Sequence, residues 1–324
     1  MSGIRIKFDE TTGEFFAEPI PRRVRDHKGK SILEFPESYT VIDIETTGLD
    51  PMFDSIIELG AIKFENGNQI SQFQSLVNPG YEIDDFIIEL TGITNDMLSE
   101  APTIQEALPN FLSFVGNSIL VGHNVNFDIN FIYDNAEYLA LPIFKNDFVD
   151  TMRISRRLYK DLENHKLSTL SNFLRVEVED AHRAMSDCIR TQLCFEKMRK
   201  YADEIGGIPK TAGEVFNHLS KTIMPETTDF DIDSPIYGMA FAFTGKLERM
   251  TRKEAMQAVA NAGGICCDGV VAETNYLVIG NFDYCKSIKG SKSAKQKKAE
   301  KMQRAGSDIA TISEDVFYDM LEQK

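Results

Sequence analysis

Apolar residues along the chain follow two successive patterns, which predict two folded parts. In the first part, alternating apolar and polar positions predict strands over Thr40–Glu45, Ser55–Phe64 and Gln69–Val77. An Asn66-Gly67 pair separates the last two strands and is typical of a tight hairpin turn. We therefore expect these three strands to form an antiparallel meander.

Helical periodicity then alternates with short apolar runs. Helices are predicted over Ile104–Phe114, Phe127–Leu139, from Asp150 or Thr151 to Leu158, and over Arg183–Met198, with a strand at Ser118–Val121. The first of these helices begins with a capping box formed by Thr103 and Glu106. The combination predicts an α/β fold in which helices flank a mixed sheet.

The second part has a smaller strand–helix pattern. Strands are predicted over Gly238–Phe243, Tyr276–Ile279 and Ile309–Ile312, and helices over Thr251–Asn261, Ala294–Ala305 and from Ser313 to Leu321. This alternation is typical of a small α/β domain with a parallel sheet. We place that domain at 236–324, a linker with a short helix around Val215–Ile223 at 201–235, and the first domain at 39–200.

The N-terminal extension, 1–38, contains one predicted hairpin, Ile4–Phe8 with Glu14–Ala17. A basic stretch with Arg22, Arg23 and Arg25 follows it. The sequence assigns no function to this segment.

Composition places the chain among globular proteins, with 324 residues, 42% hydrophobic and 26% charged. No apolar run approaches the roughly 18 residues of a membrane helix, and Met1–Lys30 is unlike a signal peptide. The five cysteines include no CxxC pair, so reduced, structural cysteines fit best. We expect a cytoplasmic protein that does not engage a membrane.

The net charge of −15 argues at first against a nucleic-acid partner, because phosphate binding usually needs basic surface. The charge is uneven, however. Residues 236–324 hold 13 Lys and Arg against 11 Asp and Glu, and the first 235 residues hold 22 against 39. The acidic excess therefore lies in the first part of the chain.

Some of these acids have a spacing that surface decoration does not require. Asp43 and Glu45 occupy alternate positions of a predicted strand, so both face one side while Ile42 and Ile44 face the other. Carboxylates held this close raise one another's pKa unless a cation neutralises them, and hard divalent ions do so well. The pair alone is also compatible with a solvated sheet edge.

Two later segments add acids at element ends. In His123–Asp128 an apolar strand ends and Asn124 or Asn126 is expected to cap the helix that carries Asp128. In His182–Asp187 a histidine precedes a helix that carries Asp187. Helix capping explains the first segment alone, and a lone histidine such as His182 is more often a surface or core group than a base. The ordered set is far more specific than any one part.

The order DxE, HNxxFD, HxAxxD resembles the DEDD exonuclease superfamily, in the subgroup with a catalytic histidine that includes proofreading epsilon subunits. The resemblance covers Tyr39–Lys200 and extends to Ile56–Ala61, Leu90–Thr94, Asp150-Thr151 and His165–Leu167. It implies an RNase H-like fold, two divalent cations, Mg²⁺ or Mn²⁺, and release of nucleoside monophosphates from a 3′ end.

The resemblance also implies a role for each residue. Asp43 would bridge both ions, Glu45 and Asp187 would hold the ion that activates water, Asp128 would support the ion at the leaving oxygen, and His182 would take the proton from water. Thr46 to Leu49 would line the terminal nucleotide with Leu49 as a wedge, and His123 and Phe127 would lie nearby. Core packing is an equal explanation for Leu49 and Phe127.

The C-terminal part resembles a BRCT domain of the kind that ends bacterial NAD-dependent DNA ligases. The resemblance rests on Ala242–Leu247, Gly263-Gly264, Thr274–Val278 and Lys298-Ala299, although Phe317 stands where the family usually has tryptophan. It implies a phosphate site of Thr244, Gly245, Arg252 and Lys295. Seven lysines and one arginine between Lys286 and Arg304 favour binding of duplex or 5′-phosphate DNA, and a solvated face is the alternative.

The sequence therefore favours an exonuclease that acts on single-stranded DNA 3′ ends, tethered to a DNA- or protein-binding module, with replication or repair proteins as possible partners. An exoribonuclease is the alternative enzyme, since the same motifs serve RNA-trimming relatives. A nucleic-acid-binding scaffold with a vestigial nuclease site is the third hypothesis, and the complete set of acids and histidine weighs against it.

Overall fold

The computed structural model describes residues 4–9, 14–19, 25, 27–142, 144–162, 164–178, 183–209, 223–227, 229–231, 233–280, 293–305, 307 and 309–322; for 4–9 and 14–19 this covers the backbone only. His182 and most of the expected linker helix lie outside these residues. The chain divides into two compact units, Arg25–Glu214 and a second unit of Met1–Val24 with Val215–Lys324.

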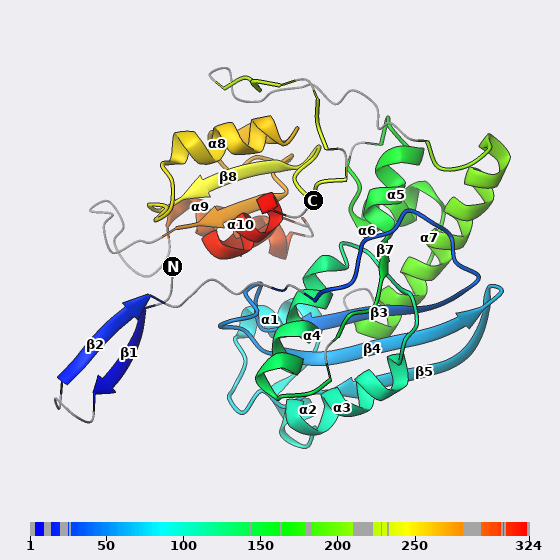
Figure 1. The fold of residues 1–324 in the computed structure, drawn as a ribbon, viewed down its shortest axis with the longest axis horizontal. Helices are drawn as coiled ribbons and strands as arrows, with labels where there is room; N and C mark the ends of the chain where they lie inside the picture. Colours follow the sequence, from blue (N-terminus) through cyan, green and yellow to red (C-terminus); the bar gives the residue numbers. More distant parts are fainter. Residues whose placement is uncertain are drawn as a thin grey trace. The chain divides into compact units, whose positions relative to one another are not determined.

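The unit Arg25–Glu214 is built on a five-stranded mixed sheet (Figure 1). Its order is β5(Asn68–Leu76)-β4(Ile56–Glu65)-β3(Ser38–Thr46)-β6(Leu120–Gly122)-β7(Phe148–Asp150). Strands β5, β4 and β3 form the predicted antiparallel meander, whereas β3, β6 and β7 are parallel. The structure thus confirms the mixed sheet and adds β7, which the sequence analysis did not predict.

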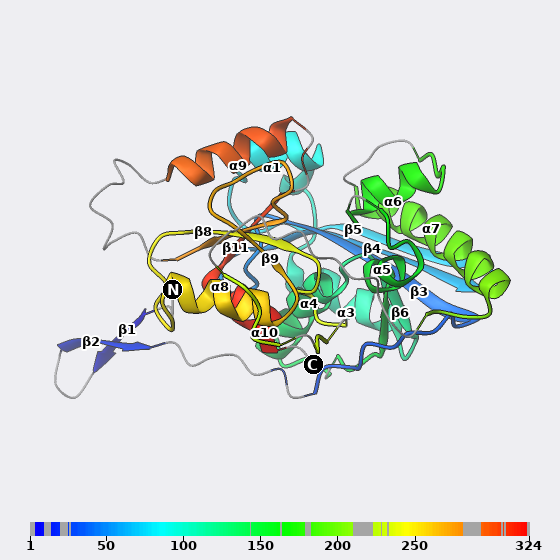
Figure 2. The same cartoon turned by 90° about the horizontal axis from the view of Figure 1, so that it is seen from above.

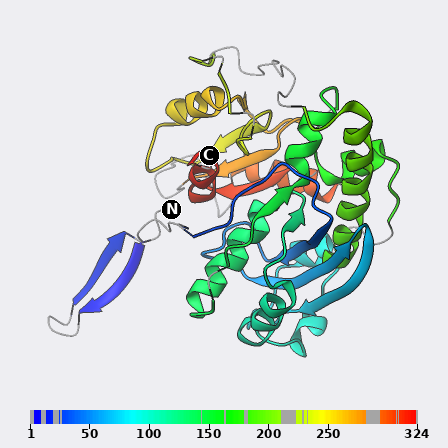
Figure 3. The same cartoon turned by 45° about the vertical axis from the view of Figure 1, so that its right-hand side comes forward.

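Helices cover both faces of this sheet (Figure 2, Figure 3). On one face, α3(Ile104–Val115) and α4(Asn126–Tyr138) share an apolar core with Ile42 and Ile44. On the other, α5(Thr151–Leu158), α6(Leu167–Phe173) and α7(Ala184–Ile205) pack on Val41 and Ile62. Two short helices, α1(Asp85–Thr91) and α2(Asn95–Ser99), follow β5.

Residues 25–38, expected to belong to an extension, lie within this unit and extend the sheet beyond β7. Ser31 forms a parallel bridge with Phe148, whose N–H donates to Lys30 O at 2.9 Å and whose carbonyl accepts from Ile32 N at 2.8 Å. A Cβ at Gly29 would lie 1.9 Å from Asn146 O, so only glycine permits this approach. We call Arg25–Ser38 the edge segment.

The edge segment also holds the outer face of α4. The Arg25 guanidinium binds Asp134 through both carboxylate oxygens, at 2.8 and 2.7 Å. The Lys28 ammonium donates to Asn126 at 3.0 Å and to Asn130 at 3.1 Å. Because these three α4 residues are four positions apart, they share one face of the helix.

The second unit contains a four-stranded parallel sheet of order β11(Ala310–Ser313)-β10(Tyr276–Ile279)-β8(Ala240–Thr244)-β9(Ile265–Cys267). Its helices are α8(Arg252–Asn261), α9(Ala294–Arg304) and α10(Glu314–Glu322). The strands β1(Ile4–Asp9) and β2(Glu14–Pro19) form the predicted antiparallel hairpin. A second sheet, parallel and accompanied by helices, is therefore present, as expected.

Within the described residues, no helix combines the length and the apolar character needed to cross a membrane. The cysteines Cys188, Cys194, Cys266 and Cys267 are free and buried.

The helix expected to end at Met198 continues as α7 to Ile205, where Gly206 in a left-handed conformation, φ 83°, ends it.

Candidate active site

Strand β3 directs two carboxylates toward the face of the sheet that α7 covers. Ile42 and Ile44 are buried in the core with α3 and α4, while Val41 packs on the α7 side. Asp43 and Glu45 alternate with the two isoleucines and therefore face α7. The predicted alternation is confirmed.

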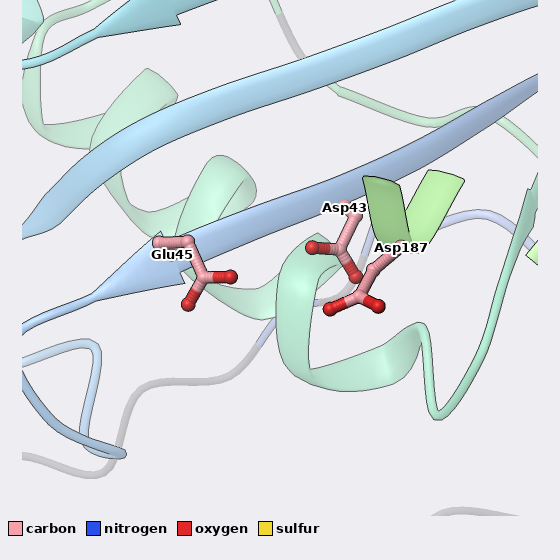
Figure 4. A group of neighbouring side chains, drawn as sticks. All are labelled: Asp43, Glu45 and Asp187. Atoms are coloured by element: carbon pink, nitrogen blue, oxygen red, sulfur yellow. The ribbon is translucent and has the colours of Figure 1, made fainter. Parts of the chain in front are cut away.

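Helix α7 brings a third carboxylate to this pair. Asp187 lies in its first turn, and one ligand oxygen from each of Asp43, Glu45 and Asp187 lies within 4.8 Å of the others. Figure 4 shows Asp187 beside Asp43, with Glu45 further along the same strand. Acids from two distant parts of the sequence, strand β3 and helix α7, thus converge.

Asp128 reaches the site from α4. Its side chain is 5% exposed, and its Oδ1 accepts a hydrogen bond from Ile44 N at 3.0 Å, so it is tied to the strand between Asp43 and Glu45. The expected cap by Asn124 or Asn126 was wrong: Val125 is the N-cap residue and no side chain caps α4. Asn124 instead adopts φ 59° and donates its N–H to Asp150.

Burial and mutual repulsion make the charged forms of these carboxylates unfavourable. Burial and repulsion from Asp128, Asp187 and Glu45 raise the pKa of Asp43 well above its usual range. Burial and the Asp187 charge raise the pKa of Glu45 to about 8. Burial also raises the pKa of Asp128 to about 8, although backbone hydrogen bonds oppose this shift.

These residues suit a hard divalent cation. All four side chains offer carboxylate oxygens, the ligands that Mg²⁺ and Mn²⁺ prefer, and the mutual repulsion is what such an ion would relieve. One protein cation is already present, since Arg190 binds Oδ1 of Asp187 at 2.8 Å. Asp187 therefore has a partner that a bound ion must compete with.

Comparison with known proteins gives the same interpretation. Residues 40–195 match the family described as exonuclease, RNase_T. The chain is 44% identical over 178 residues to the PolC-type DNA polymerase III of Caldanaerobacter subterraneus and 41% identical over 173 residues to that of Bacillus subtilis. Residues 40–195 are a DEDD-superfamily exonuclease domain.

These matches cover 55% and 52% of the chain but only 13% and 12% of the two polymerases. Most of each polymerase therefore has no counterpart in these matches. The exonuclease domain is of the 3′–5′ type and is related to the exonuclease domains of PolC-type polymerases.

Solved structures with a similar fold include exonuclease X in complex with 5′ overhanging duplex DNA, at 24% identity and a TM-score of 0.42, covering 50% of this chain and 92% of that one. Another is E. coli exonuclease I in complex with a dT13 oligonucleotide, at 19% identity and a TM-score of 0.46, covering 53% and 43%.

The exonuclease domain contains one buried acid that the sequence analysis noted only as part of a motif. Glu58 on β4 lies directly opposite Glu45 in the sheet register and is fully buried. Burial alone would raise its pKa, but hydrogen bonds from Arg183 and Gln74 outweigh this and lower the pKa below its usual value. A charged residue within the apolar run Ile56–Ile62 was the available signal.

The residues expected to line the nucleotide lie near the ends of β3 and β6. The hydroxyl of Thr46 donates to Gly48 O at 2.5 Å, and Leu49 is half-buried in the same loop. His123 is held by Thr151 Oγ1 and His165 O, both at 2.9 Å, and Phe127 packs on Phe131. Their contact with a nucleotide stays a prediction.

The residues of the expected phosphate site meet near the end of β8. Lys295 donates to the carbonyls of Phe243 and Asp268, at 2.9 and 2.8 Å, and Arg252 donates to Gly245 O at 3.0 Å. The Thr244 hydroxyl donates to Ser293 at 3.0 Å. These groups are bonded to the protein itself, and phosphate binding stays a prediction.

Proposed function

We propose that this protein is a metal-dependent 3′ to 5′ exonuclease that releases nucleoside monophosphates from DNA 3′ ends, of a proofreading or repair type. The observation that carries the proposal is the convergence of Asp43, Glu45 and Asp187, with Asp128 bonded to the strand between the first two. The related polymerases make DNA the first substrate to test.

Asp43, Glu45, Asp128 and Asp187 would hold two divalent cations, Mg²⁺ or Mn²⁺. When bound, such ions stabilise the charge on the attacking and departing oxygens of a phosphodiester. The protein's own part is positioning: β3 fixes Asp43 and Glu45, Ile44 N orients Asp128, and α7 presents Asp187. His182 would accept the proton of the attacking water, since its ordinary pKa near 6.5 suits a base at neutral pH.

The proposal is tested by digesting 5′-labelled single-stranded DNA with Mg²⁺, Mn²⁺ or EDTA and resolving the products on a gel. We expect stepwise shortening from the 3′ end with either metal and none in EDTA. Asp43→Ala should lower the rate to background without unfolding the domain, because it removes a ligand shared by the site. Activity within tenfold of the parent would contradict the two-metal assignment.

A matched RNA oligonucleotide distinguishes the alternative enzyme. Faster hydrolysis of RNA than of DNA would make the protein an exoribonuclease that trims RNA 3′ ends. Binding of either strand without hydrolysis under all metal conditions would instead indicate a scaffold with a vestigial site.

For the C-terminal unit we infer a BRCT module that tethers the enzyme to duplex or 5′-phosphate DNA, or to a replication or repair protein. Its support is the four-stranded parallel sheet and the meeting of Arg252, Gly245 and Lys295 near the end of β8. The cytoplasmic location expected from the sequence also stays a prediction.

A further inference from the structure

The carboxylate of Glu58 is saturated by protein donors. Its Oε1 accepts from Arg183 Nη2 at 2.9 Å and from Gln74 Nε2 at 2.8 Å. Its Oε2 accepts from Arg183 Nε and from Ala184 N, both at 3.1 Å. A carboxylate has about four acceptor sites, so Glu58 has no capacity left for a metal ion although it lies opposite Glu45.

Three of these four hydrogen bonds come from the start of α7. Arg183 is the N-cap residue of α7 and forms no side-chain cap of its own, and Ala184 is the first helical residue. Glu58 therefore caps this helix from strand β4 and places a negative charge at its positive end.

The same strand supports the helix directly beneath this cap. Gly60 is two positions after Glu58, so both face α7, and a Cβ at Gly60 would lie 2.9 Å from the Cβ of Ala184. Gly60 is also the register partner of Asp43. The start of α7 is thus set against the two residues of β4 that lie opposite Asp43 and Glu45.

We propose that Glu58 and Arg183 form a positioning pair that fixes the first turn of α7 and so holds Asp187 against Asp43 and Glu45. Asp187 lies three residues after Ala184, and its N–H donates to Arg183 O at 3.0 Å. This inference rests on the proposed function for its catalytic consequence, but not for metal binding.

The bidentate geometry of the pair fixes the orientation of Arg183 relative to Glu58. A guanidinium that binds a carboxylate through two nitrogens fixes orientation as well as distance, which a lysine cannot do.

The test measures Mn²⁺ affinity by calorimetry on the full chain carrying Glu58→Gln, Arg183→Lys or Gln74→Leu. Loss of a residue that orients a metal ligand typically costs 10- to 100-fold in affinity or activity. We expect that loss for Glu58→Gln and Arg183→Lys, and a smaller one for Gln74→Leu, which removes one hydrogen bond at an exposed residue. The control Glu65→Gln, at the exposed end of β4, should bind Mn²⁺ like the parent.

A substrate titration separates positioning from a general loss of structure. We expect kcat to fall about as far as Mn²⁺ affinity while KM for single-stranded DNA stays within roughly threefold. Combining Glu58→Gln with Arg183→Lys should cost little more than either alone, because the two residues act as one unit. Gln74→Leu provides the measurement if the other variants unfold.

Parental Mn²⁺ affinity in folded Glu58→Gln would overturn the proposal that Glu58 and Arg183 form a positioning pair. Fully additive losses in the double variant would overturn it as well. A parent that binds Mn²⁺ but cleaves no nucleic acid would overturn the proposed function alone, because the affinity measurements would still decide the role of Glu58.

Discussion

The proposed base, His182, precedes the start of α7 by two residues. His182→Ala should retain Mn²⁺ binding, since it removes no carboxylate, yet lose on the order of 10² to 10⁴ in rate, the usual contribution of a positioned base. Raising the pH should recover part of this loss, because hydroxide then replaces the missing base. Rates measured between pH 6 and 9 check both effects; a parental rate near pH 7 with normal metal binding would assign the base to another group.

The carboxylate cluster also makes stability depend on pH in a defined direction. The pKa values of Glu45 and Asp128, about 8 in the folded protein, exceed those of an unfolded chain, near 4. The folded state therefore binds more protons between these values, so this contribution is complete below about pH 4 and is lost as the pH rises through about 8.

In EDTA we therefore expect the unfolding temperature to fall between pH 6 and 9. Saturating Mg²⁺ should reduce this fall, because the cation replaces the protons in offsetting repulsion. Glu45→Gln should flatten the dependence in EDTA, and Glu65→Gln serves as the control. Identical pH profiles with and without Mg²⁺ would show that no cation binds these carboxylates.

At the scale of single residues, the sequence predicted those side-chain positions that depend only on neighbouring residues in the chain. Strand alternation was enough to place Asp43 and Glu45 on one side. The role of Glu58 could not be predicted in this way, because its partners Gln74 and Arg183 are distant in sequence. The wrong cap on α4 has a similar cause: the Asn126 side chain is bonded to Lys28 of the edge segment.

Among the strands and helices, the longer ones were easier to predict from the sequence than the shorter ones. The meander, α3, α4 and α7 repeat a period several times, and each was predicted, although α7 extends seven residues beyond its predicted end. Strands β6, β7 and β9 have three residues each, too few to show an alternation; β6 was predicted from its apolar run, whereas β7 and β9 were missed. The short helices α1, α2 and α6 were missed for the same reason.

The contact between α7 and β4 gives a prediction at this scale. Gly60→Ala places a methyl 2.9 Å from the Cβ and 3.1 Å from the carbonyl carbon of Ala184, so the helix must shift. We expect a loss of about 1–3 kcal/mol in unfolding free energy, typical of overpacking, together with weaker Mn²⁺ binding as Asp187 moves.

Denaturant unfolding and calorimetry measure the two effects. Adding Ala184→Gly should restore part of both, because it removes the opposing methyl, and Ala184→Gly alone is the control. Parental stability and metal affinity in Gly60→Ala would show that α7 does not depend on this contact.

At the scale of the whole molecule, charge distinguishes the C-terminal part from the rest of the chain. Residues 236–324 carry a small positive net charge and the clustered lysines, whereas the rest of the chain is strongly acidic. The fragment Met1–Asp233 retains all proposed ligands and His182, so it should still hydrolyse short single strands. It should bind duplex DNA more weakly and with a shallower salt dependence, measured by fluorescence anisotropy.

Arg252→Ala with Lys295→Ala in the full chain should reproduce part of this loss if they contact phosphate. Unchanged affinity and salt dependence in the fragment would favour a protein-docking role for the C-terminal unit.

The edge segment bears on how the catalytic domain can be isolated. The family match begins at residue 40, but a protein cut there would lose the backbone partners of Phe148 and leave β7 as an open strand edge. Open edges are templates for pairing between chains, so such a fragment is exposed to self-association. We therefore expect a stable catalytic fragment to include the edge segment, because Lys30 and Ile32 supply the backbone hydrogen bonds that cover β7.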